Sequence, residues 1–183
     1  MFYEMQIAGL TRQLPLCPLG DSMMIAGFVM FGDVEITVKC AEALLKRAPE
    51  FDVIVTAESK GIPLAHEMAR QSGKDYVVLR KEPKLYMTNV VKTGVESITT
   101  AHIQTLCLGD YERNMIQGRK VLIVDDVIST GGSLLSIEKL VNKVEGEIVG
   151  KMAVLAEGDA AQREDIVFLE PLPLFDRNGK PQE

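Results

Sequence analysis

Apolar and polar positions along the chain follow two alternating patterns. Short continuous apolar runs are typical of strands covered on both faces, and apolar residues that recur every three or four positions are typical of amphipathic helices. The strand-like runs lie at 52–57, 75–80, 120–124 and 148–155, with a further strand expected near 103–108. The helix-like patterns lie at 33–47, 62–72 and 133–144. This alternation predicts an α/β fold with a parallel sheet flanked by helices, in which ligands bind at the carboxyl ends of the strands.

Local signals mark the ends of two of these helices. Asp33 begins the first helix as its cap, because its carboxylate can accept hydrogen bonds from the free N–H groups of the first turn. The second helix has Pro63 in its first turn and ends at Gly73. In the first helix, one apolar stripe is expected to face the core: Val34, Val38, Ala41 and Leu45.

Length and charge narrow the class of protein. A chain of 183 residues fits one domain, here expected over residues 1–175 and followed by a polar tail at 176–183. Lys and Arg total 20 against 26 Asp and Glu, a formal net charge of −6. Non-specific binding to nucleic acid or to anionic lipid uses a surplus of basic side chains, so neither partner is expected. Anions must instead be bound at a local site.

The cysteine and hydropathy patterns indicate a cytosolic protein. Cys17, Cys40 and Cys107 are widely spaced and odd in number, which fits reduced, buried thiols better than a disulfide framework or a zinc site. No stretch approaches the roughly 18–20 apolar residues of a membrane span, and the N-terminal segment lacks the features of a signal peptide. His66 and His102 have no metal-ligand spacing and are expected to be structural.

The segment 121–133 carries the clearest chemistry. An apolar strand ends in Asp125 and Asp126, and a short loop of hydroxyl residues and glycines then begins a helix. Glycines let the backbone approach a ligand, and a helix N-terminus attracts anions, so this loop predicts a phosphate cradle. The lysine of the usual nucleoside-triphosphate loop and the glycine spacing of a dinucleotide site are both missing. The cradle residues are Ser129, Thr130, Gly131, Gly132 and Ser133.

Carboxylates beside a phosphate cradle suit a phosphorylated sugar, because Asp125 and Asp126 can accept hydrogen bonds from two hydroxyl groups and hold a hydrated Mg²⁺. The same segment resembles the phosphoribosyl-pyrophosphate signature of type I phosphoribosyltransferases, with four apolar residues, the two aspartates and then Thr130 to Ser133. The resemblance covers about residues 33–157. It implies a Rossmann-like parallel sheet flanked by helices, with a small hood formed by residues 1–32 and a mobile loop.

A second segment supports the resemblance. Glu58, Ser59, Lys60 and Gly61 follow a predicted strand and resemble the pyrophosphate-binding Glu-Ala-Arg-Gly loop of adenine phosphoribosyltransferases, with a lysine in place of the arginine. The string 60–65 is more similar to the bacterial purine-operon repressor and its xanthine phosphoribosyltransferase relatives. Further along, Arg80, Lys81 and Lys84 resemble a basic stretch that reaches the pyrophosphate in the adenine enzymes.

Three other segments take their expected roles from the resemblance. Residues 86–100 correspond to the mobile loop that closes over the active site, where Glu96 is a candidate for proton handling. Phe28 or Phe31 is a candidate for contact with the base under the hood. The apolar segment 171–175 is expected to pack on the core, with a cover over the nucleobase or over a dimer partner as the alternatives.

The resemblance implies transfer of a 5-phosphoribosyl group from phosphoribosyl pyrophosphate to a purine, with Mg²⁺ as cofactor and a homodimer as the expected assembly. Asp125 and Asp126 would be the catalytic and metal-binding residues, directly or through water, and Ser129 to Ser133 would hold the 5-phosphate. Lys60, Arg80 and Lys81 would hold the pyrophosphate. Adenine is the favoured base, and xanthine or another oxopurine stays open. The alternative is a non-catalytic regulatory module that senses phosphoribosyl pyrophosphate.

Overall fold

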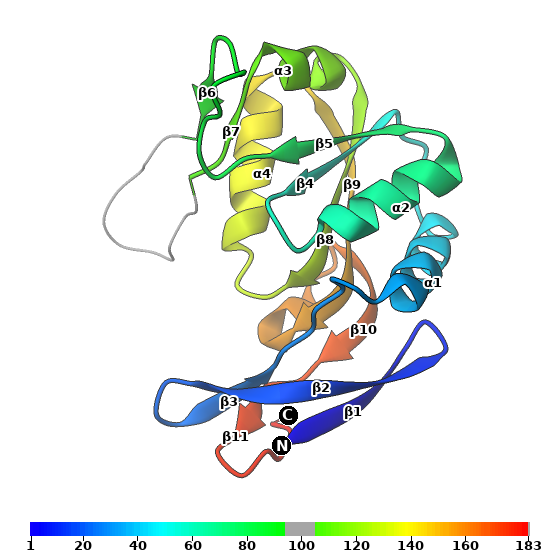
Figure 1. Cartoon of the computed structure of the whole chain (residues 1–183), viewed down its shortest axis with the longest axis vertical. Helices are drawn as coiled ribbons and strands as arrows, with labels where there is room; N and C mark the ends of the chain where they lie inside the picture. Colours follow the sequence, from blue (N-terminus) through cyan, green and yellow to red (C-terminus); the bar gives the residue numbers. More distant parts are fainter. Residues whose placement is uncertain (94–104, 183) are drawn as a thin grey trace.

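A five-stranded parallel sheet forms the centre of the computed structural model, which describes residues 1–93 and 105–182 (Figure 1). Each neighbouring pair of strands in this sheet is parallel. The predicted α/β fold is therefore confirmed. The strands, in spatial order, are β10 (Val167–Leu172), β9 (Glu147–Glu157), β8 (Lys120–Ile128), β4 (Val53–Ala57) and β5 (Asp75–Leu79).

Helices cover both faces of the sheet (Figure 1). One face carries α1 (Val34–Leu45) and α2 (Ile62–Ser72), and the other carries α3 (Asp110–Ile116) and α4 (Gly132–Lys143). Successive strand residues point to opposite faces, so Ile54 packs with α1 and α2 while Val53 and Val55 pack with α4. Burial on both faces explains why the apolar runs in the sequence are continuous rather than alternating.

The predicted helix ends are confirmed, but the predicted stripe of α1 is only partly correct: Ala41 is buried and Leu45 packs against the core, whereas Val34 faces outward. Asp33 caps α1 and accepts a hydrogen bond from the Ile36 N–H at 3.1 Å, and α2 ends at Gly73 with φ +69°. Val34 is 73% exposed. Because α1 packs against both α2 and the β9–β10 edge, its buried face is centred on Cys40. That face consists of Ile36, Thr37, Cys40, Ala41 and Leu44.

Strand β8 is longer than the sequence pattern predicts. The apolar run suggests a strand that ends before Asp125, whereas β8 continues to Ile128 and pairs with β9 along this extension. Pairing with β4 ends at Ile123, so beyond that point one edge of β8 is open. The two aspartates therefore lie within a strand, beside a free sheet edge.

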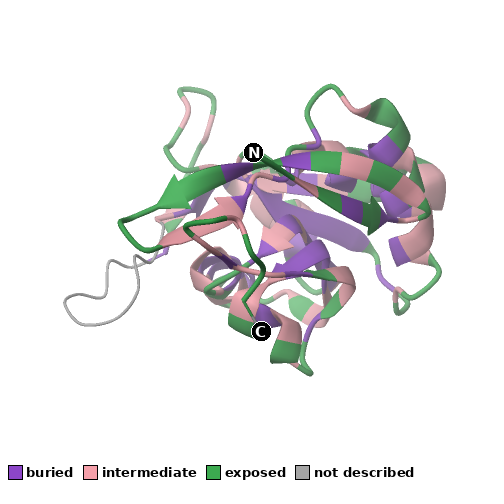
Figure 2. Cartoon of the chain, turned by 90° about the horizontal axis from the view of Figure 1, so that it is seen from below, coloured by how far each residue is buried: buried purple, intermediate pink, exposed green. Residues whose placement is uncertain are grey.

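A second sheet forms the hood at one end of the molecule. Its antiparallel order is β1 (Phe2–Ile7), β2 (Leu10–Leu19), β3 (Met23–Ala26) and β11 (Phe175–Asp176). The β1–β2 turn consists of Ala8 and Gly9, both with positive φ, as a tight two-residue hairpin requires. Buried and exposed residues alternate along β1 (Figure 2), so one face of the hood packs on the sheet body.

The two chain ends meet in the hood (Figure 1). Phe175 is fully buried and its ring packs edge-on against Tyr3, with 4.9 Å between the ring centroids. Segment 171–175 thus packs on the core, as expected. Within the predicted polar tail, Asp176 belongs to β11 and the Gln182 N–H donates to the Leu174 carbonyl.

Several smaller predictions have mixed outcomes. Of the three free cysteines, Cys40 and Cys107 are buried, but Cys17 is exposed because it lies on the outer face of β2. His66 packs edge-on against Tyr76, consistent with a structural role. Glu96 and His102 lie outside the described residues, as do residues 94–100 of the expected mobile loop.

Short elements complete the described chain. Strands β6 (Val91–Lys92) and β7 (Cys107–Leu108) form an antiparallel pair, and η1 (Gly158–Gln162) is a 3-10 helix between β9 and β10. Among the helices of residues 1–93 and 105–182, none has the length and apolar character needed to cross a membrane.

Candidate active site

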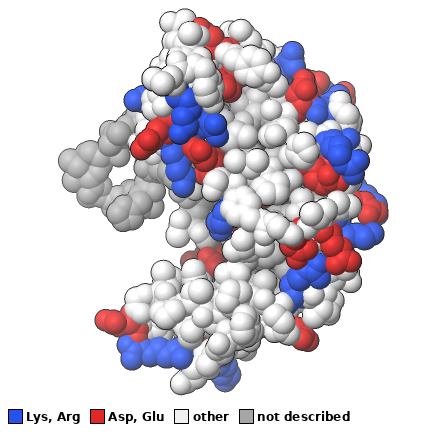
Figure 3. Space-filling view, viewed as in Figure 1, with Lys and Arg blue, Asp and Glu red and all other residues white. Residues whose placement is uncertain are grey.

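A cavity of about 600 Å³ lies at the carboxyl ends of β4, β8 and β9, with the hood on its other side. Figure 3 shows the recess between the hood and the sheet body, on a face where acidic and basic side chains are interspersed. Most of the residues predicted for the site meet there, although they come from three segments of the chain. Those that line the cavity are Glu58, Ser59, Lys60, Lys81, Asp125, Asp126, Ser129 and Ser133.

The β8–α4 loop contains the residues predicted for the phosphate cradle. Thr130, Gly131 and Gly132 line a recess of about 50 Å³ that also includes Ser129 and Ser133 and adjoins the main cavity. Gly131 precedes α4 and has φ +79°, a conformation that strongly favours glycine. A loop of this kind presents backbone N–H groups at a helix N-terminus and can bind a phosphate.

The two aspartates differ in their surroundings. Asp126 is 3% exposed, and its Oδ2 lies 3.1 Å from Lys60 Nζ. Asp125 is partly buried, and its Oδ1 accepts a hydrogen bond of 2.9 Å from the Asp126 backbone N–H. Burial and the neighbouring charge of Asp126 raise the pKa of Asp125 above its usual value. The pair thus places two carboxylates where a cation or sugar hydroxyl groups could bind.

The β4–α2 loop lies directly against these aspartates. A Cβ atom at Gly61 would clash with Thr56 Oγ1 and would lie 3.0 Å from Asp125 Oδ1, so this close approach requires glycine. Thr56 Oγ1 is buried and has no hydrogen-bond partner within the described residues. The peptide bond between Glu58 and Ser59 is cis. This loop brings Lys60 to the open edge of β8.

Glu58 joins this loop to the end of β5. Its Oε1 lies 3.3 Å from Arg80 Nη1, and its Oε2 accepts a hydrogen bond of 3.1 Å from the Lys81 backbone N–H. Arg80 also donates to the Tyr86 hydroxyl at 3.1 Å. Lys81 lines the cavity, whereas Arg80 and Lys84 do not. In this arrangement Arg80 is paired with a carboxylate rather than turned toward the cavity.

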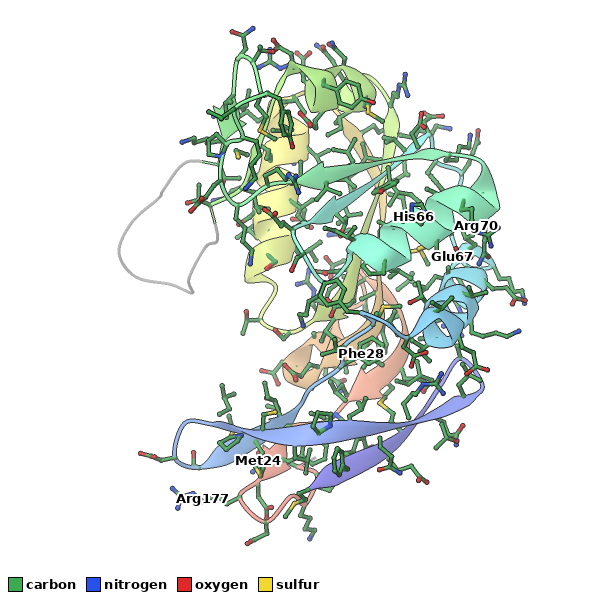
Figure 4. All side chains as sticks on the ribbon, viewed as in Figure 1. Met24, Phe28, His66, Glu67, Arg70 and Arg177 are labelled. Atoms are coloured by element: carbon green, nitrogen blue, oxygen red, sulfur yellow. The ribbon has the colours of Figure 1, made fainter. Side chains whose placement is uncertain are left out.

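The hood wall of the cavity is apolar and was largely missed by the sequence analysis. It consists of Ile25 to Val29. Phe28 is 4% exposed and lies on the segment between β3 and α1, between the hood and the sheet body (Figure 4). Phe31 is 52% exposed and does not line the cavity, so of the two candidate phenylalanines only Phe28 is suitably placed. The available signal was the apolar run 23–31.

Glu157 is a further cavity residue that sequence reasoning missed. It ends β9 and is partly buried, which raises the pKa of its carboxyl group, while the charge of Lys60 acts in the opposite direction. The signal that could have found it is an acidic residue at the carboxyl end of a central parallel strand.

Comparisons with known proteins agree with this geometry. Residues 35–172 match the family model described as "Phosphoribosyl transferase domain". The chain is 33% identical over 153 residues to the adenine phosphoribosyltransferase of Acetivibrio thermocellus, covering 80% of this chain and 84% of that protein. It is also 33% identical over 110 residues to the purine biosynthesis transcriptional repressor PurR of Bacillus subtilis, covering 60% and 38%. The fold is similar to that of the adenine phosphoribosyltransferase of Thermoanaerobacter pseudethanolicus, with a TM-score of 0.69, 20% identity, and coverage of 86% and 95%.

Proposed function

Because the chain belongs to the phosphoribosyl transferase domain family, we propose that it transfers the 5-phosphoribosyl group of phosphoribosyl pyrophosphate to a purine, with adenine favoured, and releases pyrophosphate. One observation carries the proposal: the paired aspartates and the Glu58–Lys60 loop line one cavity at the carboxyl ends of the strands, and the phosphate cradle lines a recess that adjoins it. Three anionic or hydroxylated parts of one substrate can therefore be bound side by side.

The donor has a natural orientation in this cavity. The 5-phosphate would bind in the cradle formed by Ser129 to Ser133, where glycine backbone and the N-terminus of α4 favour an anion. The ribose hydroxyls would donate to Asp125 and Asp126. Lys60 and Lys81 would then face the diphosphate, with Arg80 free to join them once it leaves Glu58. The diphosphate would compete with Asp126 for Lys60.

Catalysis would come from positioning and charge rather than from a covalent nucleophile. Positive charge develops at the anomeric carbon as the bond to the diphosphate breaks, as in glycosyl transfer generally. The carboxylates at the ribose stabilise that charge, and the basic side chains stabilise the departing diphosphate. The apolar hood wall limits water at the reacting centre.

The residues of the site fit a Mg²⁺ ion that arrives with the diphosphate. Magnesium keeps several waters and needs only one or two protein carboxylates beside substrate phosphates. Asp125 and Asp126 supply such a pair, whereas residues 1–93 and 105–182 contain no cluster of three or more metal-binding side chains. When bound, the ion would neutralise charge on the diphosphate.

The test is direct. The protein is incubated with Mg²⁺, phosphoribosyl pyrophosphate and adenine, hypoxanthine, guanine or xanthine, and both pyrophosphate and nucleotide are measured. We expect equal amounts of the two products, fastest with adenine. If no nucleotide forms with any of the four bases, the proposed transferase activity is refuted.

A regulatory module that senses phosphoribosyl pyrophosphate is the second candidate. The similarity to the repressor PurR favours it, and so does the repressor-like string at 60–65. The same incubation separates the two: tight binding of the donor by calorimetry without turnover would indicate a sensor. A homodimer stays a prediction, which light scattering at several protein concentrations can test.

A further inference from the structure

Glu157 is the cavity carboxylate that binding of the donor leaves without a role. It follows Ala156, which pairs with Ile128 near the end of β8. It lines the cavity with the hood segment Ile25–Val29 and with Lys60. Within the described part of the chain its carboxylate has no hydrogen-bond partner, and it interacts electrostatically with Lys60. A partly buried carboxylate without a partner is costly unless a ligand supplies one.

The position of Glu157 relative to the hood indicates which part of a ligand it would meet. The cradle, the aspartates and the basic residues occupy the sheet side of the cavity. A base attached to the anomeric carbon must therefore lie toward the hood, where Ile25, Phe28 and Val29 offer apolar contact to the faces of a flat ring. Apolar side chains cannot bind the polar edge of that ring. Glu157 lines the same cavity as this wall, and its carboxylate can accept a hydrogen bond from that edge.

We propose that Glu157 is a specificity-determining residue whose carboxylate accepts a hydrogen bond from the exocyclic amino group of the base, so that the site selects a 6-aminopurine over a 6-oxopurine. The inference rests on the proposed function and refines it. A carboxylate accepts hydrogen bonds and cannot donate them when ionised. A 6-oxo group at the same place would set oxygen lone pairs against a charged oxygen and leave both groups unpaired.

A structural role for Glu157 makes a different prediction. If its carboxylate served only to orient Lys60, loss of that charge would weaken binding of the diphosphate and would affect every base equally. If the Glu157 carboxylate binds the amino group, its removal would change the kinetics with bases that carry this group and leave the kinetics with other bases unchanged. Unsubstituted purine, which has hydrogen in place of the amino group, separates the two roles.

The experiment is a cycle of two protein variants and three bases. Steady-state kcat/KM is measured for adenine, hypoxanthine and unsubstituted purine with the parent protein, Glu157→Ala and Glu157→Gln. We expect Glu157→Ala to lower kcat/KM for adenine by at least about tenfold and that for unsubstituted purine by less than about threefold, because removal of the carboxylate and removal of the amino group are not additive. Glu157→Gln should reduce the preference for adenine over hypoxanthine by about tenfold or more, since an amide can donate to a carbonyl.

Controls keep the result interpretable. Asp159→Asn removes a carboxylate two residues away that lines a different cavity, and it should leave the preference for adenine unchanged. Circular dichroism and thermal unfolding verify that each variant is folded, and Glu157→Gln preserves side-chain volume if the alanine variant is unstable. KM for phosphoribosyl pyrophosphate should change by less than about twofold.

Two outcomes would overturn the inference, and they differ. Equal losses for all three bases with a raised KM for the donor would assign Glu157 to the positioning of Lys60, while the proposed function stands. Failure of the parent protein to form nucleotide from any base would refute the proposed function and the inference with it.

Discussion

The two walls of the cavity are built in opposite ways. The sheet wall consists of strand ends and the loops that follow them, and it carries paired carboxylates, lysines and backbone N–H groups within the short segments 57–61 and 125–133. The hood wall is apolar, and it stands beside an antiparallel sheet to which both ends of the chain contribute. One wall is charged and local in sequence, and the other is apolar and assembled from distant segments.

This difference separates two tasks. Phosphate, ribose and diphosphate are common to every reaction of the proposed kind, whichever base is used, and they would face the sheet wall. The base is the part that varies between such reactions, and in the proposed arrangement it would face the hood wall and Glu157. Substitutions in the sheet wall should therefore change binding of the donor and turnover, and substitutions in the hood wall should change the constants for the base.

The largest effect is expected for Gly131→Val in the cradle. Gly131 has φ +79°, and a Cβ atom there would lie 2.7 Å from Arg163 Nη1, so valine should distort the cradle and weaken donor binding by at least about 100-fold in calorimetric titration. Gly118→Val is the matched control, because Gly118 also has positive φ, at +70°, but has open space around its Cβ position. Normal donor affinity in a folded Gly131→Val variant would exclude the loop as the phosphate site.

A smaller loss is expected for Asp126→Asn. The substitution preserves shape but removes a buried charge 3.1 Å from Lys60 Nζ, so kcat/KM should fall by about 10- to 100-fold while the fold is retained. Asp75→Asn, at the opposite end of the sheet on an exposed residue, serves as the control and should be neutral. Unchanged steady-state kinetics would remove Asp126 from the catalytic assignment.

Ionisation of Asp125 should lower the free energy of unfolding of the protein as the pH rises. Its pKa is raised in the folded protein by burial and by the charge of Asp126, so the folded state holds the proton more tightly than the unfolded chain, whose value is near 3.8. Protonation of Asp125 therefore stabilises the folded state. This stabilisation is fully present below the pKa of the unfolded chain and is lost as the pH rises through the pKa of the folded protein.

Asp125→Asn should remove this pH dependence. The free energy of unfolding of both proteins is measured with urea at several pH values. The value for the variant minus that for the parent should increase by roughly 1–3 kcal/mol between about pH 5 and pH 8, since one pKa unit corresponds to about 1.4 kcal/mol. Asp75→Asn, an exposed substitution at the opposite end of the sheet, is measured in parallel as the control for replacement of an aspartate. A constant difference across this range would mean that Asp125 titrates normally.

The smallest effect is expected at the hood wall. Phe28→Leu keeps an apolar contact but loses the aromatic face, so KM for the base should rise by about 3- to 10-fold while KM for the donor stays within about twofold. Phe51→Leu is a suitable control, because Phe51 is equally buried in the same core cluster but does not line the cavity. Equal changes in both KM values would contradict the separation of the two walls.

Much of the sheet wall could be predicted from the sequence because its polar residues lie close together along the chain. A strand, two carboxylates, a glycine loop and a helix occur within 13 residues, 121–133, and backbone geometry then fixes the site. The length of β8 was underestimated because acidic residues are rare in strands. Here the strand is maintained by pairing with β9 after β4 has ended.

The hood wall could be predicted only in outline. The alternating burial in β1 is a strand signal, but which segment completes the sheet depends on pairing between β3 and Phe175–Asp176, far apart in the chain. Glu157 carries no local motif at all, because its importance comes from the position of its strand in the sheet. The ion pair between Arg80 and Glu58 could not be predicted from the sequence either, since it depends on how two neighbouring loops approach each other.

The pairing of β3 with β11 also has a consequence for biosynthesis. During translation, the strands β1 to β3 leave the ribosome before the parallel sheet does, and β11, which completes their sheet, leaves after it. By then the parallel sheet, the cradle and both aspartates have already emerged. The nascent protein would therefore be able to assemble its parallel sheet and cradle before β11 completes the sheet of the hood.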